Sequence, residues 1–295
     1  MLKLALPIMM GAAVLAGAMP AAAADLYQPP IVEAPPPIYV TPEPAPSFSG
    51  WYIRGDVGYG LLGFRGASYI TYGCPVGSPT CTPPGPSPDV QPLSGSLRGA
   101  FTVGVGVGTQ VSKHVRVDLT GDYFFKADFR GSSSGTGCGA GPCTSTDTAT
   151  FSALLLMANA YVDLGTWHGI TPYVGAGIGG AHVSWGDLHN ITTGTAVHKG
   201  AANWRFAWAL MAGASYCMTD KLKLDVGYRY ARVNGGRMFE WGPAGAAVGA
   251  GPGFDRGIDI HQVRGGLRYS FGGDASCGSK EFVSYDPPEP LPIYK

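Results

Sequence analysis

The chain has 295 residues, of which 46 are glycine, 25 are proline and only 14% are charged, and its formal net charge is zero. The balance of 20 basic and 20 acidic residues excludes the positive field that draws proteins to nucleic acid. A content of 45% hydrophobic residues excludes an intrinsically disordered chain. Because a soluble protein carries about 25–35% charged residues on its surface, we expect part of this protein to face something other than water.

The first 24 residues have the pattern of a secretory signal peptide. Lys3 is followed by an apolar run over residues 4–19 and then by a stretch of alanines. A short apolar segment that ends in small residues is removed by signal peptidase. We expect cleavage after Ala23 or Ala24, so that Ala24 or Asp25 becomes the first residue. No later run approaches the length of a spanning helix, so a membrane domain here would consist of strands.

Proline-rich segments lie on both sides of the remaining chain. Residues 25–48 contain eight prolines, and Pro287, Pro288, Pro290 and Pro292 lie in the last nine residues. Proline has no backbone N–H to give to a sheet and favours extended chain. We therefore expect linkers at 25–49 and 272–295 and one folded domain at 50–271.

Within the folded domain, apolar and polar residues alternate with a period of two, which is typical of strands with unlike faces. In the clearest segment, Val115, Val117 and Leu119 alternate with Arg116 and Asp118. Eight segments of about ten residues or slightly more show the pattern, the fifth with an ambiguous register: 51–59, 101–108, 115–126, 154–163, 172–184, 204–216, 222–230 and 262–271.

The connections between these segments alternate strictly between long and short. Long connections are 61–97, 129–148, 185–203 and 233–257, whereas 110–114, 165–171 and 218–221 are short. This is the topology of outer-membrane barrels, with short periplasmic turns and long external loops. The sequence therefore predicts an all-β, eight-stranded antiparallel transmembrane β-barrel with proline-rich periplasmic extensions at both termini.

A secreted lipocalin-type barrel is the alternative, because its strands alternate in the same way. Its exterior would need lysine and glutamate on every strand. Here the polar positions include many glycines, alanines and serines, which suits a crowded interior. The apolar face also carries tyrosine and tryptophan near strand ends, as an interfacial girdle requires. The aromatic residues are Trp51, Tyr59, Tyr123, Trp204, Tyr216, Tyr228 and Tyr269.

The strings GWYIRGDVGYG, MANAYVDLG, TPYVGAGIG, LMAGASY and LDVGYRY resemble the OmpA-like, porin-family outer-membrane β-barrels of alphaproteobacteria over residues 50–271. GGLRYSF, with Leu267, Tyr269 and Phe271, is similar to the C-terminal insertion signal that the barrel assembly machinery reads. The resemblance also implies that a mature N-terminus at Ala24-Asp25 could be cross-linked to peptidoglycan. Any signal-peptide end followed by a proline-rich spacer has a similar appearance.

The polar strand faces carry eight cations and five anions, which in a narrow lumen should form a hydrogen-bonded ion-pair network. One interpretation is structural, since side chains can fill an eight-stranded barrel. The other is a narrow pore lined by arginines that prefers anions weakly. The predicted lumen residues are Arg54, Asp56, Arg116, Asp118, Asp122, Lys126, Asp163, Arg205, Lys223, Asp225, Arg229, Arg264 and Arg268.

Six cysteines in an exported chain predict disulfides. Cys74 with Cys81 and Cys138 with Cys143 would each close a small ring in an external loop. Cys217, near the periplasmic end of its strand, could pair with Cys277 and hold the C-terminal tail beneath the barrel.

Enzymatic and metal-binding patterns are sparse. His189, His198 and Asp187 share a loop and could capture a metal weakly, although solvated loop histidines are the simpler interpretation. Ser184, Asp187 and His261 could form a rim triad, but no G-x-S-x-G or comparable motif supports one. We expect no catalytic, cofactor or metal site.

The predicted function is a structural outer-membrane barrel that contributes to envelope integrity. The alternatives are a small porin for hydrophilic solutes and an adhesin that binds through its loops. The expected partners are outer-membrane lipid and lipopolysaccharide, the barrel assembly machinery during insertion and, through the N-terminus, peptidoglycan. Nucleic acid is not expected to bind.

Overall fold

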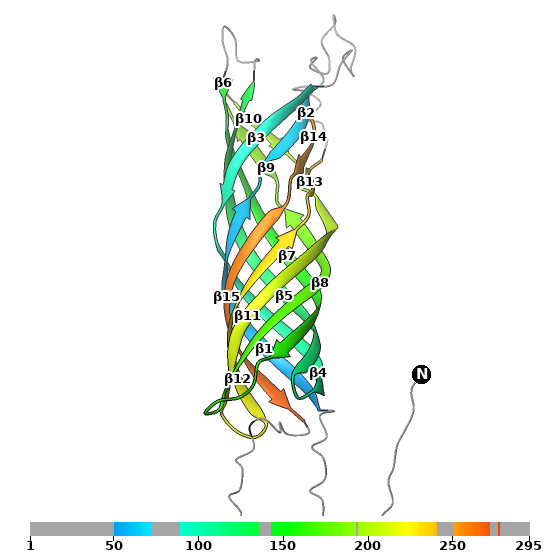
Figure 1. Ribbon diagram of the computed structural model, residues 1–295. Coiled ribbons are helices and arrows are strands. Elements are labelled where there is room, and N and C mark those ends of the chain that lie inside the picture. The colour runs from blue at the N-terminus through cyan, green and yellow to red at the C-terminus, as the bar shows by residue number, and fades with distance from the viewer. Residues whose placement is uncertain are drawn as a thin grey trace, which may run out of the picture. The chain divides into compact units, whose positions relative to one another are not determined.

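The computed structural model describes residues 50–71, 89–135, 143–192, 194–240, 250–271 and 277. The regular elements in these ranges are β-strands (Figure 1). Within the same ranges there is no helix with the length and apolar character needed to cross a membrane.

Eight antiparallel strands close into a barrel in chain order, which confirms the predicted all-β, eight-stranded antiparallel barrel. Each strand pairs with the one before and after it, and the last closes the ring on the first through pairs that run from Tyr52↔Ser270 to Phe64↔Ile258. The barrel strands are β1 (Trp51–Phe64), β4 (Ala100–Ser112), β5 (Val115–Gly135), β7 (Thr146–Asp163), β8 (Ile170–Trp185), β11 (Ala202–Cys217), β12 (Leu222–Val233) and β15 (Ile258–Ser270).

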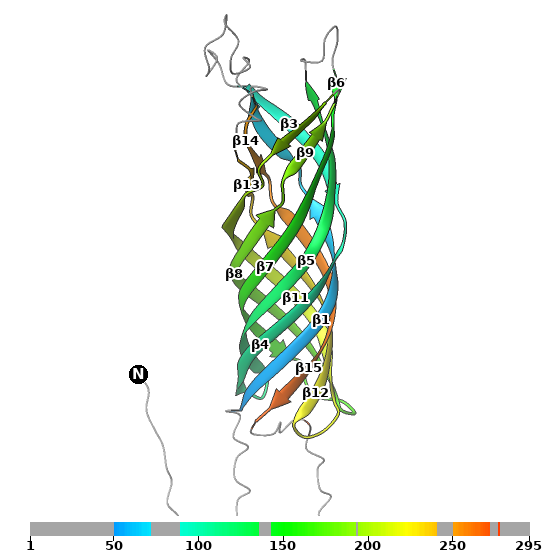
Figure 2. The same cartoon turned by 180° about the vertical axis from the view of Figure 1, so that it is seen from behind.

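The barrel wall is longer than predicted, because parts of the long connections are themselves strands. At the end of the barrel opposite residues 50 and 271, which we call the distal end, short strands continue the sheet beside β5 and β7 (Figures 1 and 2). The prediction that the long connections are loops throughout was therefore wrong, because parts of each form strands. The additional strands are β2 (Ala67–Thr71), β3 (Asp89–Leu97), β6 (Cys143–Thr144), β9 (Leu188–Ile191), β10 (Thr195–His198), β13 (Gly236–Phe239) and β14 (Ala250–Asp255).

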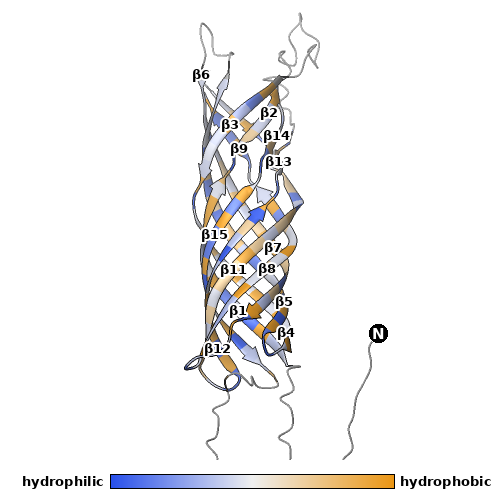
Figure 3. Ribbon diagram, viewed as in Figure 1, coloured by the Kyte–Doolittle hydropathy of each residue, from blue (hydrophilic) through white to orange (hydrophobic). Residues whose placement is uncertain are grey.

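The outer surface of the barrel carries a band of apolar side chains. Figure 3 shows apolar residues concentrated on the part of the barrel nearer residues 50 and 271, which we call the terminal end. Along β12, outward residues from Leu222 to Tyr230 span about 20 Å perpendicular to the membrane, for a rise of about 3.3 Å per residue and a tilt of about 40°. Exposed aromatics lie near both edges of the band, as membrane interfaces favour: Trp51, Trp167, Tyr216, Tyr269 and Phe271 at the terminal edge, and Tyr59, Phe101, Tyr123, Trp204 and Tyr228 at the distal edge.

Inward-facing glycines make room for large side chains in the lumen. A Cβ added at Gly108 would lie 2.5 Å from Cζ of Tyr52, and one at Gly175 would lie 2.5 Å from Cδ1 of Tyr161. Such separations are far below van der Waals contact. Gly108 of β4 and Gly175 of β8 are therefore packing positions opposite large lumen residues.

Candidate functional site in the barrel lumen

The charged residues predicted for the lumen are almost all buried. Twelve of the thirteen are no more than 7% exposed, and eleven of these lie on the strand portions surrounded by the apolar band. We call these eleven residues the charged lumen: Arg54, Asp56, Arg116, Asp118, Asp122, Asp163, Lys223, Asp225, Arg229, Arg264 and Arg268.

Lys126 is the exception, and its predicted inward orientation was wrong. The pairing of β5 with β7 shifts register between Phe124 and Ala127, so that Phe125 and Lys126 are both exposed. A β-bulge inserts one extra residue and inverts the alternation beyond it. After the bulge, Ala127 and Phe129 are the buried residues of β5.

Ion pairs connect strands across the charged lumen. Arg229 Nη1 lies 2.6 Å from Asp122 Oδ2, and both side chains are at most 1% exposed. Arg54 bridges two carboxylates, with Nη2 2.7 Å from Asp56 Oδ1 and Nη1 3.2 Å from Asp118 Oδ2. Two further pairs are Arg116–Asp163 at 3.0 Å and Arg268–Asp225 at 3.3 Å. These contacts neutralise most of the buried charge, as a low-dielectric interior requires.

Three arginines contact Tyr161, a residue that the pattern of charges in the sequence does not indicate. Arg54 and Arg264 donate to its hydroxyl at 3.5 and 3.3 Å, and the guanidinium of Arg116 lies 4.1 Å from the centroid of its ring. Arg264 otherwise donates to Met211 Sδ at 3.4 Å. The inward parity of Tyr161 was readable from the sequence, but a tyrosine among arginines gives no charge signal.

Neutral polar side chains extend the network. Asn159 donates to Asp118 Oδ1 at 2.8 Å, and Gln262 both accepts from Arg229 at 2.8 Å and donates to Thr102 at 2.6 Å. Hydrogen bonds of this kind satisfy buried polar atoms that the ion pairs leave over.

Arg205 lies apart from the charged lumen, in the distal part of the barrel. Its Nη1 is 2.7 Å from Asp255 Oδ1, and Asp255 also accepts from Nε1 of Trp185 at 3.1 Å. Asp255 is on β14, a strand within a predicted loop, so alternation could not assign it to the interior.

Between these two polar regions the lumen is filled by apolar side chains. Phe129, Phe151 and Trp185 are at most 3% exposed, with ring centroids 5.6 Å apart for Phe129–Trp185 and 5.2 Å for Phe151–Trp185. We call this buried group, continuous with the rest of the distal core, the apolar plug: Leu62, Phe124, Phe129, Phe151, Leu155, Trp185, Ile258 and Ile260. Protein interiors of this kind pack at crystal-like density.

The histidines considered for metal binding do not face one another. In the β9–β10 hairpin, His189 pairs with Val197 and is exposed, whereas the adjacent pair is Leu188 with His198, which is buried. Neighbouring pairs of a hairpin point to opposite faces. Within the residues that the structure describes, no three His, Cys, Asp or Glu side chains could hold a metal ion together.

His198 lies in the distal interior near Asp147. Burial lowers the pKa of His198 below its ordinary value, and the charge of Asp147 opposes that shift. Asp147 itself is fully buried and accepts from Ser145 at 3.0 Å and from Asn190. This serine–aspartate–asparagine group was not predicted, because its residues lie in two different predicted loops, 129–148 and 185–203.

The three residues considered for a catalytic triad at the rim, Ser184, Asp187 and His261, do not form one. His261 is exposed on β15, where its Nδ1 is 2.6 Å from the hydroxyl of Tyr228. Ser184 is on β8, with β11 and β12 between the two strands. Asp187 is exposed and accepts from the backbone of Gly200 at 3.0 Å.

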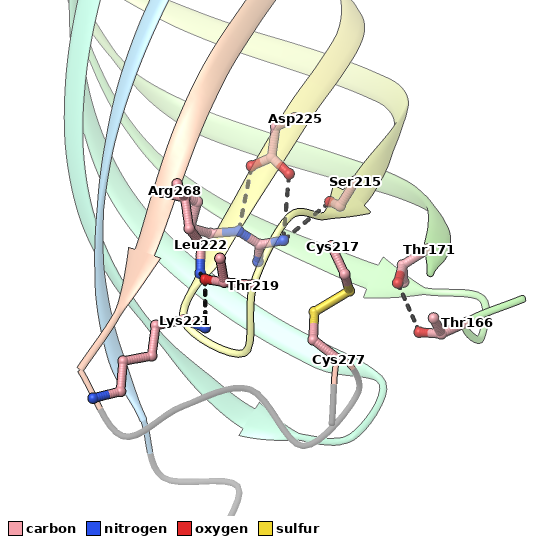
Figure 4. Close-up of a disulfide and its surroundings, with 10 residues drawn as sticks. All are labelled: Thr166, Thr171, Ser215, Cys217, Thr219, Lys221, Leu222, Asp225, Arg268 and Cys277. Atoms are coloured by element: carbon pink, nitrogen blue, oxygen red, sulfur yellow. Dashed lines mark hydrogen bonds and ion pairs between the residues drawn. A yellow bond between two sulfur atoms is a disulfide. The ribbon is translucent and has the colours of Figure 1, made fainter. Parts of the chain in front are cut away.

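A disulfide joins Cys217, the last residue of β11, to Cys277, at a sequence separation of 60 (Figure 4). It lies near Arg268, which donates to Ser215 at 3.0 Å. Leu267, Tyr269 and Phe271 point outward at and just beyond the end of β15. Cys74, Cys81, Cys138, the Cys143 side chain, Ala23, Ala24 and Asp25 lie outside the described residues.

Comparisons with known proteins agree with this architecture. Residues 11–271 match the model of the family described as outer membrane protein beta-barrel domain. An uncharacterized protein of Brucella abortus is 37% identical, covering 85% of this chain and 93% of that protein.

Other similarities are more distant. A putative adhesin of Rickettsia bellii is 26% identical, covering 58% of this chain and 75% of that protein. The crystal structure of OprG from Pseudomonas aeruginosa is similar with a TM-score of 0.41 and 15% identity, covering 75% of this chain and 96% of that chain. The match over residues 11–271 and the closed eight-stranded barrel show that the chain belongs to the outer-membrane protein β-barrel domain family.

Proposed function

We propose that this protein is a structural, non-conducting barrel that strengthens the outer membrane. The observation that carries the proposal is the apolar plug, which fills the lumen beyond the charged residues. A hydrated ion would lose its water among Phe129, Phe151 and Trp185 without gaining a polar partner. The charged lumen then stabilises the barrel through ion pairs that join strands from different parts of the ring.

Conductance in planar lipid bilayers tests this proposal. We expect no steady openings from the folded protein, with incorporation checked by heat-modifiable migration on gels. A variant with Phe129→Ala, Phe151→Ala and Trp185→Ala removes the large plug side chains and leaves the charged lumen intact. Its conductance should exceed that of the wild type. Steady wild-type openings that Arg116→Ala or Arg229→Ala weakens would instead establish the porin alternative.

In the proposed orientation, both termini face the periplasm and the distal end faces outward. The turn between β4 and β5 and the turn between β11 and β12 are short and lie at the terminal end, whereas the distal end carries the long connections. Outer-membrane barrels place short turns in the periplasm. Protease added to intact cells should cleave only sites introduced in distal connections, such as one at Thr192, and should spare a site introduced at Thr219.

A role in surface binding is the second candidate. The similarity to a protein named as a putative adhesin favours it. The distal strands β2, β3, β13 and β14 also provide a hydrogen-bonded platform beyond the apolar band. Attachment of cells that express the protein, compared with cells that express a variant lacking residues 241–249, would test this role.

The proposed anchor in the cell wall depends on the N-terminal linker. Ala24-Asp25, followed by the proline-rich segment, would place a free amino group within reach of peptidoglycan. Mass spectrometry of purified muropeptides should find a peptide that begins at Ala24. Only unlinked N-termini in that preparation would remove the anchor from the proposal.

A further inference from the structure

Two arginines contact one carboxylate on the outer surface of the barrel, at the distal edge of the apolar band. Asp259 Oδ1 is 2.7 Å from Nη1 of Arg232, and Asp259 Oδ2 is 3.3 Å from Nη1 of Arg65. Arg232 also donates to the backbone oxygen of Arg256 at 3.2 Å. Arg65, Arg232 and Asp259 form this group, which we call the arginine cluster, and its two guanidiniums and one carboxylate give it a net charge of +1.

The local chain folds so that the cluster is preformed. Strand pairing sets Arg232 on β12 opposite Asp259 on β15, with β1 on the other side of β15. The turn at Arg65-Gly66 and the turn at Arg256-Gly257 are joined by two backbone hydrogen bonds, Arg65 N to Gly257 O at 3.3 Å and Arg256 N to Gly66 O at 2.9 Å. Gly66 and Gly257 have positive φ angles of 91° and 101°, a backbone conformation that residues with a side chain rarely adopt.

Much of the donor capacity of these arginines is unused. A guanidinium carries five N–H donors, whereas the side chain of Arg65 makes one ion pair and is 53% exposed. Asp259 accepts from both Arg232 and Arg65, and also from the hydroxyl of Tyr230 at 3.0 Å. It therefore orients the two guanidiniums and cannot neutralise both.

The surface below the cluster is apolar and aromatic. The ring of Tyr230 lies 5.2 Å from the ring of His261, and outward Val263 and Leu61 are at least 60% exposed further toward the terminal end. A ligand with an anionic head and hydrocarbon tails would match both parts of this surface. Paired guanidiniums favour phosphate among such anions, because their fork geometry fits its oxygens.

We propose that the arginine cluster binds the phosphate group of a membrane lipid whose acyl chains lie over Leu61 and Val263. If the distal end faces outward, as proposed above, the lipid belongs to the outer leaflet and the phosphate is that of lipid A. The phosphate lies against Arg65 and Arg232, with Asp259 as the positioning residue between them.

Native mass spectrometry of the detergent-solubilised protein, titrated with single lipids, tests the site. We expect bis-phosphorylated lipid A to bind and its dephosphorylated form to bind at least about tenfold more weakly, because charge-assisted hydrogen bonds are worth about 1.5–3 kcal/mol each. Phosphatidylglycerol reports whether a phosphodiester suffices. Inorganic phosphate at millimolar concentration reports whether the tails contribute. If phosphatidylglycerol binds as tightly as lipid A, the phosphate site stands and its assignment to lipid A is overturned.

The variant Arg65→Gln with Arg232→Gln should weaken the binding of phosphorylated lipid about tenfold or more. The matched control is Arg98→Gln with Arg130→Gln, which removes the same charge from exposed positions near β3 and β5. Arg65→Lys with Arg232→Lys keeps the charge, guards against a folding defect, and should give intermediate affinity. The site would be overturned if the glutamine variant and its control lost affinity equally, or if dephosphorylated lipid A bound as tightly as phosphorylated lipid A. It would also be overturned if inorganic phosphate competed as strongly as the phosphorylated lipid.

Discussion

The pair Arg229–Asp122 allows the energetics of the charged lumen to be tested directly. We expect Asp122→Ala to lower the free energy of unfolding by about 3–5 kcal/mol, because it leaves a fully buried guanidinium without its carboxylate. The pair Arg237–Glu240 has nearly the same separation, 2.7 Å, but its side chains are 47% and 39% exposed. Glu240→Ala should therefore cost no more than about 1 kcal/mol, since solvent screens exposed pairs.

The double variant Asp122→Ala with Arg229→Met separates pairing from burial. Removing both charges also removes the cost of their desolvation, so it should be more stable than Asp122→Ala alone. It should remain about 1–3 kcal/mol below the wild type, because Gln262 loses the donor that lies 2.8 Å away.

Urea unfolding in lipid vesicles, followed by tryptophan fluorescence, measures the free energy of unfolding of the wild type and the three variants. Heat-modifiable migration on gels confirms that each one folds before titration. An Asp122→Ala variant within about 1 kcal/mol of the wild type would contradict the expected cost of the unpaired guanidinium. A double variant less stable than Asp122→Ala would contradict the expected cost of burying both charges.

Three further predictions concern other parts of the barrel. Replacing Cys217 and Cys277 by serine should lower the free energy of unfolding by about 4 kcal/mol, because the disulfide closes a ring between residues at a sequence separation of 60 and restricts the unfolded chain. Peptide mapping without reductant that finds Cys217 as a free thiol would contradict this prediction. Gly175→Val should destabilise the barrel by about 1–3 kcal/mol or more, because its side chain would occupy the space of the Tyr161 ring, whereas the outward-facing variant Ala176→Val should be nearly neutral in the same assay. Burial lowers the pKa of His198 in the folded protein, so below the ordinary histidine pKa of 6.5 the unfolded state binds a proton more readily than the folded state, and the free energy of unfolding should fall by up to about 1.4 kcal/mol per pH unit as the pH drops below 6.5. His198→Gln should remove this slope from urea titrations made between pH 7.5 and 5. An unchanged slope in this variant would assign the pH dependence to other groups.

Much of the lumen could be predicted from alternation alone. Arg116 and Asp118 face inward because every second residue of a strand lies on the same side. The same rule failed at Lys126, where a bulge in β5 shifts the alternation by one residue. A bulge depends on how two strands pair, and nothing in the local pattern around Lys126 indicates it.

The distal strands were hidden for a related reason. β3 contains Pro92, one glycine and two serines, which weaken any alternation, yet it pairs with β2 on one side and β5 on the other. These hydrogen bonds join segments that are far apart in sequence. Asp255 and the arginine cluster were missed because their residues lie in or beside such connections.

The sequence by itself determined the strand faces, the number of barrel strands and the class of membrane protein, because lipid outside and crowded polar groups inside impose a period of two. Only the tertiary structure decided which charges pair, where the apolar plug fills the lumen, and how two arginine-glycine turns meet beside Asp259. Those features depend on strand register and on contacts between distant segments. Composition and local periodicity carry no record of either.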